Sequence, residues 1–248
     1  MSTRLLALMI AMLAFSPGFA GKALALSITY QDGVTSEAAA ITEFRTRGGM
    51  IAGLEVMAVF SDGESETMSW VANSGASGGV IGSGWSLIQS GDTFRSAWTL
   101  SMDGSSSDST DTPSAIAKLV LNAGPGSSVF DIQSRGTGTR GSELGGAFEL
   151  EGDYEGLSVT YSDRITISGR SPVGDLYNTL TLAFSEENRF SAGQSLRFVT
   201  DMDNLITLAS RSVEPLGDGA AVPIPSAVWL FISSLAGLAG IGRWPRKT

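Results

Sequence analysis

Apolar and polar residues alternate along much of the chain with the period of two that is typical of β-strands. In residues 54–60, 157–161 and 179–184, apolar side chains occupy every second position. Since successive side chains of a strand point to opposite faces, each segment predicts a strand with one buried face. Further segments with the composition of short strands are residues 26–30, 38–46, 66–72, 85–89, 94–102, 116–122, 128–133, 164–168 and 195–200. About a dozen short strands separated by Gly, Ser, Asp and Asn predict an all-β fold, an antiparallel β-sandwich or jelly roll.

The N-terminal 25 residues have the organisation of a secretory signal peptide. A single early cation, Arg4, precedes an apolar run over residues 5–15 that ends at a Ser-Pro-Gly sequence. Ala23 and Ala25 supply the small residues of a cleavage site, and residues 18–20 offer a competing one. Because the apolar run is shorter than the about 20 residues of a membrane-spanning helix, we predict a cleaved signal peptide over residues 1–25.

The C-terminal residues combine a Pro motif, a short apolar segment and a basic end. The motif is Val222-Pro223-Ile224-Pro225-Ser226-Ala227, the apolar segment runs to Gly242, and the basic end begins at Arg243. Pro fixes an extended backbone before the apolar segment, and the cations after it favour a cytoplasmic end. The pattern predicts a transmembrane helix within residues 222–248 that acts as a sorting signal, and its shortness favours a transient span.

This tripartite tail resembles the PEP-CTERM sorting domain of exported Gram-negative proteins, in the variant with Val-Pro-Leu-Pro-Ala before the helix. Ile224 stands in place of Leu, Ser226 stands in place of Ala, and Trp244 and Pro245 interrupt the basic cluster. The resemblance implies that an exosortase, an integral-membrane protease, recognises the tail and cleaves near the Pro motif. It also implies an inner-membrane-tethered precursor that passes to the periplasm and then to the cell surface or the exopolysaccharide matrix.

The distribution of charge supports export independently of this resemblance. All 25 acidic residues lie between Asp32 and Asp218, whereas five of the 16 basic residues flank the two hydrophobic ends. Cations beside both hydrophobic segments favour a cytoplasmic location for both ends before processing, which places the acidic body in the periplasm. The acidity of the body argues against nucleic acid as a partner, because phosphates would be repelled. Without Cys, the fold cannot rely on disulfides.

Between the two ends we expect a single ectodomain. Residues 26–212 suffice for one all-β domain with a sizeable core. Residues 73–84, 103–114 and 134–146 are rich in Gly or Ser and predict long loops. Residues 213–221 contain Pro and Gly and predict a linker to the sorting signal.

Two motifs match enzymatic signatures, but their surroundings do not fit. Residues 75–79 match G-x-S-x-G around Ser77, yet the chain has no His to act as the base. Residues 136–141 match G-x-G-x-x-G, but the sequence that follows cannot open the helix that would hold a pyrophosphate. A Ser-Lys pair would require Lys118, which we expect on the outer surface of a strand. We therefore predict a non-enzymatic protein.

Acidic and aromatic side chains leave several hypotheses open. Glu149 and Glu151 would project from one face of an extended segment, as in a two-carboxylate glycosidase or, more simply, in a solvated edge strand. Three tryptophans, Trp70, Trp85 and Trp98, would form a sugar-binding platform if exposed, but their positions in strand patterns favour the core.

A metal site is the remaining hypothesis about chemistry. Asp201, Asp203 and Asn204 offer clustered oxygens suited to Ca²⁺, although Asp-rich segments also form turns without a ligand. No other cofactor is indicated. We thus predict an exported surface or matrix protein associated with exopolysaccharide or biofilm. The alternatives are a carbohydrate-binding or adhesin module and, less favoured, a carboxylate-dependent glycosidase.

Overall fold

A computed structural model describes residues 26–33, 36–104, 114–133, 138–142 and 144–207. Within these residues the chain forms strands and two short 3-10 helices, and the strands make two sheets. The prediction of an all-β sandwich is confirmed. The predicted signal peptide, the linker and the sorting signal lie outside the described residues.

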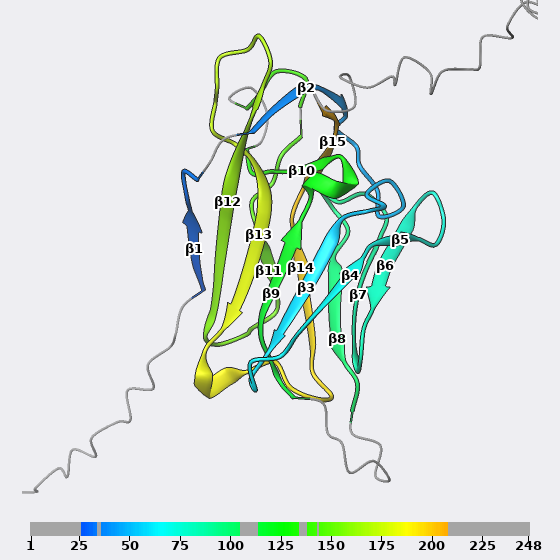
Figure 1. The fold of residues 1–248 in the computed structure, drawn as a ribbon, viewed down its shortest axis with the longest axis vertical. Helices are drawn as coiled ribbons and strands as arrows, with labels where there is room; N and C mark the ends of the chain where they lie inside the picture. Colours follow the sequence, from blue (N-terminus) through cyan, green and yellow to red (C-terminus); the bar gives the residue numbers. More distant parts are fainter. Residues whose placement is uncertain (1–25, 34–35, 105–113, 134–137, 143, 208–248) are drawn as a thin grey trace, which may run out of the picture.

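The larger sheet has nine strands and closes partly on itself (Figure 1). Its order is β1 (Ser27–Tyr30), β12 (Leu157–Ile167), β2 (Ser36–Glu43), β15 (Met202–Thr207), β10 (Ser128–Asp131), β13 (Leu176–Phe184), β9 (Ile116–Asn122), β3 (Glu55–Phe60) and β4 (Ser65–Ser69). Strand β12 also pairs with β13, so β12, β2, β15, β10 and β13 form a closed ring. Most pairs are antiparallel, but β1 and β2 both run parallel to β12, one after the other along the same edge.

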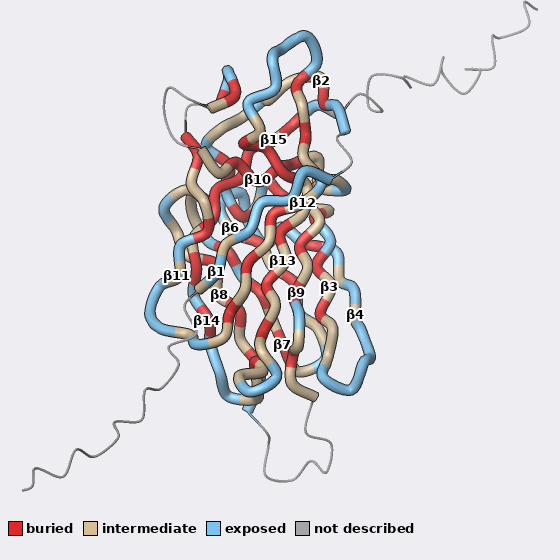
Figure 2. The backbone as a smooth tube through the Cα atoms, turned by 90° about the vertical axis from the view of Figure 1, so that its left-hand side faces the viewer, coloured by how far each residue is buried: buried red, intermediate tan, exposed pale blue. Residues whose placement is uncertain are grey.

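The smaller sheet has six antiparallel strands packed across the larger one. Its order is β11 (Glu149–Glu151), β14 (Ser195–Val199), β8 (Trp98–Met102), β7 (Trp85–Ser90), β6 (Ser77–Ile81) and β5 (Val71–Ala72). The 3-10 helices are η1 (Gly124–Gly126), which follows β9, and η2 (Glu186–Asn188), which follows β13. Buried residues run through the middle of the molecule, between the two layers (Figure 2).

The main core is built from the inward-facing residues of both sheets, and its centre is aromatic. Trp98 stacks on Phe198 with ring centroids 6.1 Å apart and contacts Trp70 at 5.1 Å. Trp70, Trp85 and Trp98 are at most 2% exposed. Their indole N–H groups donate to Gly48 O, Glu66 Oε2 and Thr200 O. The tryptophans are therefore core residues, and the hypothesis of a tryptophan sugar platform does not hold.

A second, smaller core fills the interior of the strand ring. It consists of the buried residues Ala38, Val129, Ile165, Ile167, Leu176 and Leu205. These residues come from all five strands of the ring, so each strand turns one face inward, as the period-two pattern requires. The ring therefore has its own apolar interior, and buried polar residues at the end of the ring are unexpected in such surroundings.

The predicted strand boundaries differ from the observed ones where Gly or Asp obscured the pattern. The predicted loop 73–84 is wrong in its middle, because residues 77–81 form β6. A Cβ on Gly78 would lie 2.3 Å from Trp70 Nε1 and 2.5 Å from Gly48 O, so Gly is required there by close packing. The predicted strand 66–72 divides at Trp70 into β4 of one sheet and β5 of the other.

Two predicted strands are joined in the structure, and strand β15 was not predicted. The predicted strands 157–161 and 164–168 are joined in the single long strand β12, which keeps one register with β13 on both sides of Asp163. Residues 202–207, which begin in the Asp-rich segment, form β15. This strand pairs with both β2 and β10 and closes the ring.

Candidate functional site

Two of the three residues predicted to bind metal are buried inside the fold. Asp201 and Asp203 are fully buried; Asp203 lies on β15, and Asp201 comes immediately before this strand. The carboxylate of Asp201 is close enough to raise the pKa of Asp203. Asn204 lies on the opposite side, where its Oδ1 accepts from Thr46 and its Nδ2 donates to Met50 O. The structure therefore brings Asp201 and Asp203 together but separates Asn204 from them.

Two further aspartates that were not predicted as ligands complete an acidic cluster. Asp131 is fully buried at the end of β10, and Asp175 is 1% exposed just before β13. Asp203 pairs in register with Val129, which shares a face with Asp131, so the two carboxylates lie on neighbouring strands facing inward. We define the acidic cluster as Asp131, Asp175, Asp201 and Asp203.

The carboxylates of this cluster differ in how well they are satisfied. Asp175 accepts from Thr139 N at 2.5 Å and from Thr139 Oγ1 at 2.6 Å. Asp131 accepts from Gln133 N at 3.0 Å and from the Ser142 hydroxyl. Asp201 Oδ1 accepts from Thr93 Oγ1 at 2.9 Å. In contrast, both carboxylate oxygens of Asp203 and the Oδ2 atom of Asp201 lack a hydrogen-bond partner among the described residues.

Burial in this cluster disfavours the charged form of each unsatisfied carboxyl group. Burial raises the pKa of Asp203 to about 9, with further increases from Asp131 and Asp201, against a decrease from the Ser142 hydroxyl. Burial likewise raises the pKa of Asp201 to about 8 and that of Asp131 to about 7. At neutral pH, Asp203 and Asp201 therefore hold protons unless a positive charge lies among the carboxyl groups of the cluster.

Residues 138–142 and 144–146, between β10 and β11, lie against the cluster, and we call them the covering segment. The Ser142 hydroxyl lies within hydrogen-bond distance of Asp131 Oδ2 and of Leu144 O. Gly146 N donates to Asp131 O, and Asp201 N donates to Gly146 O. A Cβ on Gly145 would lie 2.7 Å from Asp131 Oδ1 and 2.1 Å from Gln133 O. Only Gly allows the segment to come this close to the carboxylate.

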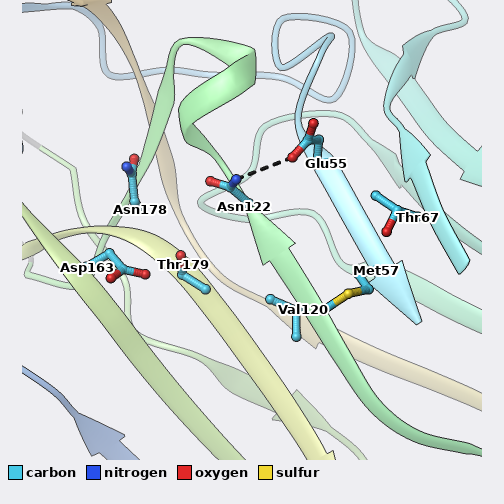
Figure 3. A pocket seen from close by; sticks show the side chains of 8 residues that line it. All are labelled: Glu55, Met57, Thr67, Val120, Asn122, Asp163, Asn178 and Thr179. Carbon is cyan, nitrogen blue, oxygen red and sulfur yellow. Dashed lines mark hydrogen bonds between the residues drawn. The ribbon is translucent and has the colours of Figure 1, made fainter. Parts of the chain in front are cut away.

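A groove on the solvent-facing side of the nine-stranded sheet is a second candidate site (Figure 3). Its volume is about 420 Å³, and it is lined by Glu55, Met57, Thr67, Val120, Asn122, Asp163, Asn178 and Thr179. These residues come from β4, β3, β9, β13 and β12. Met57 and Val120 pair in register and form an apolar floor, and amides and carboxylates surround them. We call this surface the outer groove.

The polar side chains of the outer groove are held in defined orientations. Gly124 N donates to Asn122 Oδ1 at 3.3 Å, which directs Nδ2 toward Glu55 Oε2 at 3.4 Å. Asp163 has a φ of 59°, in the left-handed region that residues other than Gly seldom adopt. It lies between the part of β12 that pairs with β1 and the part that pairs with β2. Such strained residues concentrate at functional sites.

The residues considered for catalysis lie apart from one another. Ser77 is on β6 of the smaller sheet, whereas Lys118 is exposed on β9 of the larger sheet. Ser77 Oγ hydrogen-bonds to Ser74 Oγ at 3.0 Å. Glu149 is exposed on β11, and Glu151 pairs with Arg197 at 2.9 Å. The structure therefore places Glu149 and Glu151 on an edge strand, where the simpler interpretation located them.

The predicted sorting and cleavage residues fall in the two ends of the chain that the structure does not describe. The sorting residues Val222, Pro223, Ile224, Pro225, Ser226, Ala227 and Arg243, and the cleavage residues Ala23 and Ala25, lie outside the described residues. Among the helices of the described part, none has the length and apolar character needed to cross a membrane.

Comparisons with known proteins identify no relative that would assign a role to the acidic cluster or the outer groove. No protein-family model, curated protein or solved structure matches the chain. Within the described residues, no three or more His, Cys, Asp or Glu side chains form a group that could hold a metal ion. A site built on three carboxylates is thus not found in the acidic cluster as it stands.

Proposed function

We propose that this chain is an exported, non-enzymatic protein of the cell surface or extracellular matrix that binds polysaccharide through the outer groove. The observation that carries the binding proposal is the groove itself, with orientated amides and carboxylates around an apolar floor. Sugars suit such a surface. Their hydroxyl groups can hydrogen-bond to the amides and carboxylates, and their apolar C–H faces can pack on the apolar floor. The groove volume also falls in the range of ligand-binding clefts.

The direction of the groove favours a chain of sugars over a single sugar. Its lining residues span four strand spacings, from β4 to β12, which corresponds to about 19 Å. Glu55 and Thr67 lie toward one end, while Asp163 lies toward the other (Figure 3). An oligosaccharide laid across these strands would meet polar groups at both ends and Met57 between them.

Export is supported by the order of segments along the chain. The described body completes its two cores between residues 26 and 207, and the predicted signal peptide and sorting signal flank it. The tail motif of residues 222–227 and the basic end from Arg243 support processing by an exosortase-type protease. The bound polysaccharide would then be that of the matrix to which the protein is delivered.

The experiment is a binding assay with the full chain purified in detergent and extracellular polysaccharide from the host. We expect weak, saturable binding, and a 3- to 10-fold loss of affinity, roughly that of one hydrogen bond, in Asn122→Ala. The matched control is Ser65→Ala, an exposed change on β4 outside the groove. Equal affinity of Asn122→Ala and wild type would refute the groove as the site. Release of new reducing ends from the polysaccharide would refute the non-enzymatic assignment.

A further inference from the structure

The acidic cluster contains a buried carboxylate that the described protein atoms do not satisfy. Asp203 is 0% exposed, and neither of its carboxylate oxygens has a hydrogen-bond partner among the described residues. A buried polar group without a partner costs about 1–3 kcal/mol, and a charged one costs more. The neighbouring charges that act on Asp203 are the carboxylates of Asp131, Asp201 and Asp175. A ligand of positive charge would offset this cost.

The covering segment brings more acceptor oxygens to the cluster than it brings protons to donate to them. The Ser142 hydroxyl lies within hydrogen-bond distance of both Asp131 Oδ2 and Leu144 O, the latter at 2.7 Å. A hydroxyl carries one proton and can donate to only one of these two acceptors. Acceptor oxygens from β10, β15 and the covering segment therefore meet at one end of the strand ring.

We propose that Asp203 and Asp131, together with the Ser142 hydroxyl and the Leu144 carbonyl, form a binding site for one Ca²⁺ ion. Two carboxylates balance the charge of a divalent cation. Neutral hydroxyl and carbonyl oxygens are accepted ligands of Ca²⁺, so the site does not require a third carboxylate. This ligand set is compatible with the lack of a three-carboxylate group in the described residues.

The chemistry of the site favours Ca²⁺ over other divalent cations. All four groups offer oxygen, whereas Zn²⁺ sites are built mainly from Cys and His, which this chain lacks. Mg²⁺ gives up its water reluctantly and keeps several water ligands, which a site of fully buried carboxylates does not suit. Asp201, whose Oδ1 accepts from Thr93 Oγ1, lies beside the site and leaves its Oδ2 without a partner among the described residues. Binding would fasten the covering segment to β10 and β15.

The test compares thermal unfolding and calorimetric titration of the full chain in detergent, treated with EDTA and then titrated with CaCl₂ at pH 8. We expect one Ca²⁺ per chain. At a Ca²⁺ concentration 100-fold above Kd, we expect the melting temperature to rise by about 5 to 10 °C. MgCl₂ at the same concentration should produce a much smaller rise. Absence of a response to 10 mM CaCl₂ in folded wild-type protein would overturn the proposal, and would indicate that protons alone neutralise the cluster.

Variants separate this site from adventitious binding at the acidic surface. Asp203→Asn keeps the side-chain shape and removes the charge, so the Ca²⁺ response should be lost while the protein still folds. Asp131→Asn should also lose the response, and it serves as a second variant if the first is recovered unfolded. The matched control is Asp153→Asn, an exposed position, which should respond as wild type does. A full response in both Asp203→Asn and Asp131→Asn would overturn the assignment.

Discussion

Gly78 provides a direct test of the packing between the two sheets. It lies in β6 beneath the indole of Trp70, which donates to Gly48 O at 2.8 Å. A Cβ at position 78 would lie 2.3 Å from Trp70 Nε1, 2.5 Å from Gly48 O and 2.8 Å from Val71 O. Gly78→Ala must therefore move an indole, two backbone segments, or both.

The expected cost follows from these contacts. Overpacking a well-packed site costs about 1–3 kcal/mol. Displacement of the Trp70 indole from Gly48 O would leave a buried donor unsatisfied, at about 1–3 kcal/mol. Since the two costs overlap, we expect Gly78→Ala to lower the free energy of unfolding by about 2–4 kcal/mol. For a domain of this size that corresponds to a fall in melting temperature of about 4 to 16 °C.

The assay is chemical and thermal denaturation of the full chain in detergent, followed by Trp fluorescence. The matched control is Gly75→Ala in the same G-x-S-x-G stretch, where an added Cβ meets nothing within 4 Å. We expect this control to stay within about 0.5 kcal/mol of wild type. In a Trp70→Phe background, Gly78→Ala should cost less, because the indole nitrogen is absent. If Gly78→Ala matched Gly75→Ala in stability, the close approach described for β6 would be incorrect.

Two further predictions concern an acid-sensitive contact and the sorting signal. Burial raises the pKa of Glu66, but hydrogen bonds from Ser83 and Trp85 outweigh burial, so the pKa is lowered overall. The ionised Glu66 therefore stabilises the fold at pH values above the ordinary Glu pKa, and this stabilisation is lost as pH falls through the lowered pKa. Glu66→Gln should therefore melt below wild type at pH 7, and the gap should close in melts below about pH 4; a gap independent of pH would contradict this. Replacement of Pro223 and Pro225 by Ala should let a helix extend across the cleavage region, so that uncleaved precursor accumulates in the inner membrane. A tail-specific immunoblot measures this, and normal cleavage would contradict the sorting hypothesis.

The sequence predicted those parts of the fold that depend on local pattern. Residues 116–122 were predicted as a strand and form β9 with the same bounds. Strands β6 and β15 were missed because some of their residues are determined by contacts with distant parts of the chain, and these residues interrupt the alternation of apolar and polar positions. Gly78 serves close packing, and Asp203 occupies an inward-facing position that apolar residues normally fill.

The candidate sites depend on topology that a single sequence does not reveal. The acidic cluster unites β10, β15 and the covering segment, and the outer groove takes residues from five strands. One local signal was nevertheless present. Asp131 follows Val129 at the inward-facing position of a predicted strand, where a charged residue is unexpected. A search for charges at such positions would have identified Asp131 from the sequence alone.

The closed strand ring imposes an order on the folding of this chain. Strand β15, near the end of the body, pairs with β2 near its start, and Thr42 Oγ1 donates to Asn204 O across 162 positions of sequence. Contacts between such distant residues form late and slow the folding of β-proteins. If the chain crosses the membrane from its N-terminus, the ring cannot close until nearly the whole body has crossed. A tail that pauses in the membrane would then hold the body in place during this interval, so that cleavage too early would release an unclosed ring.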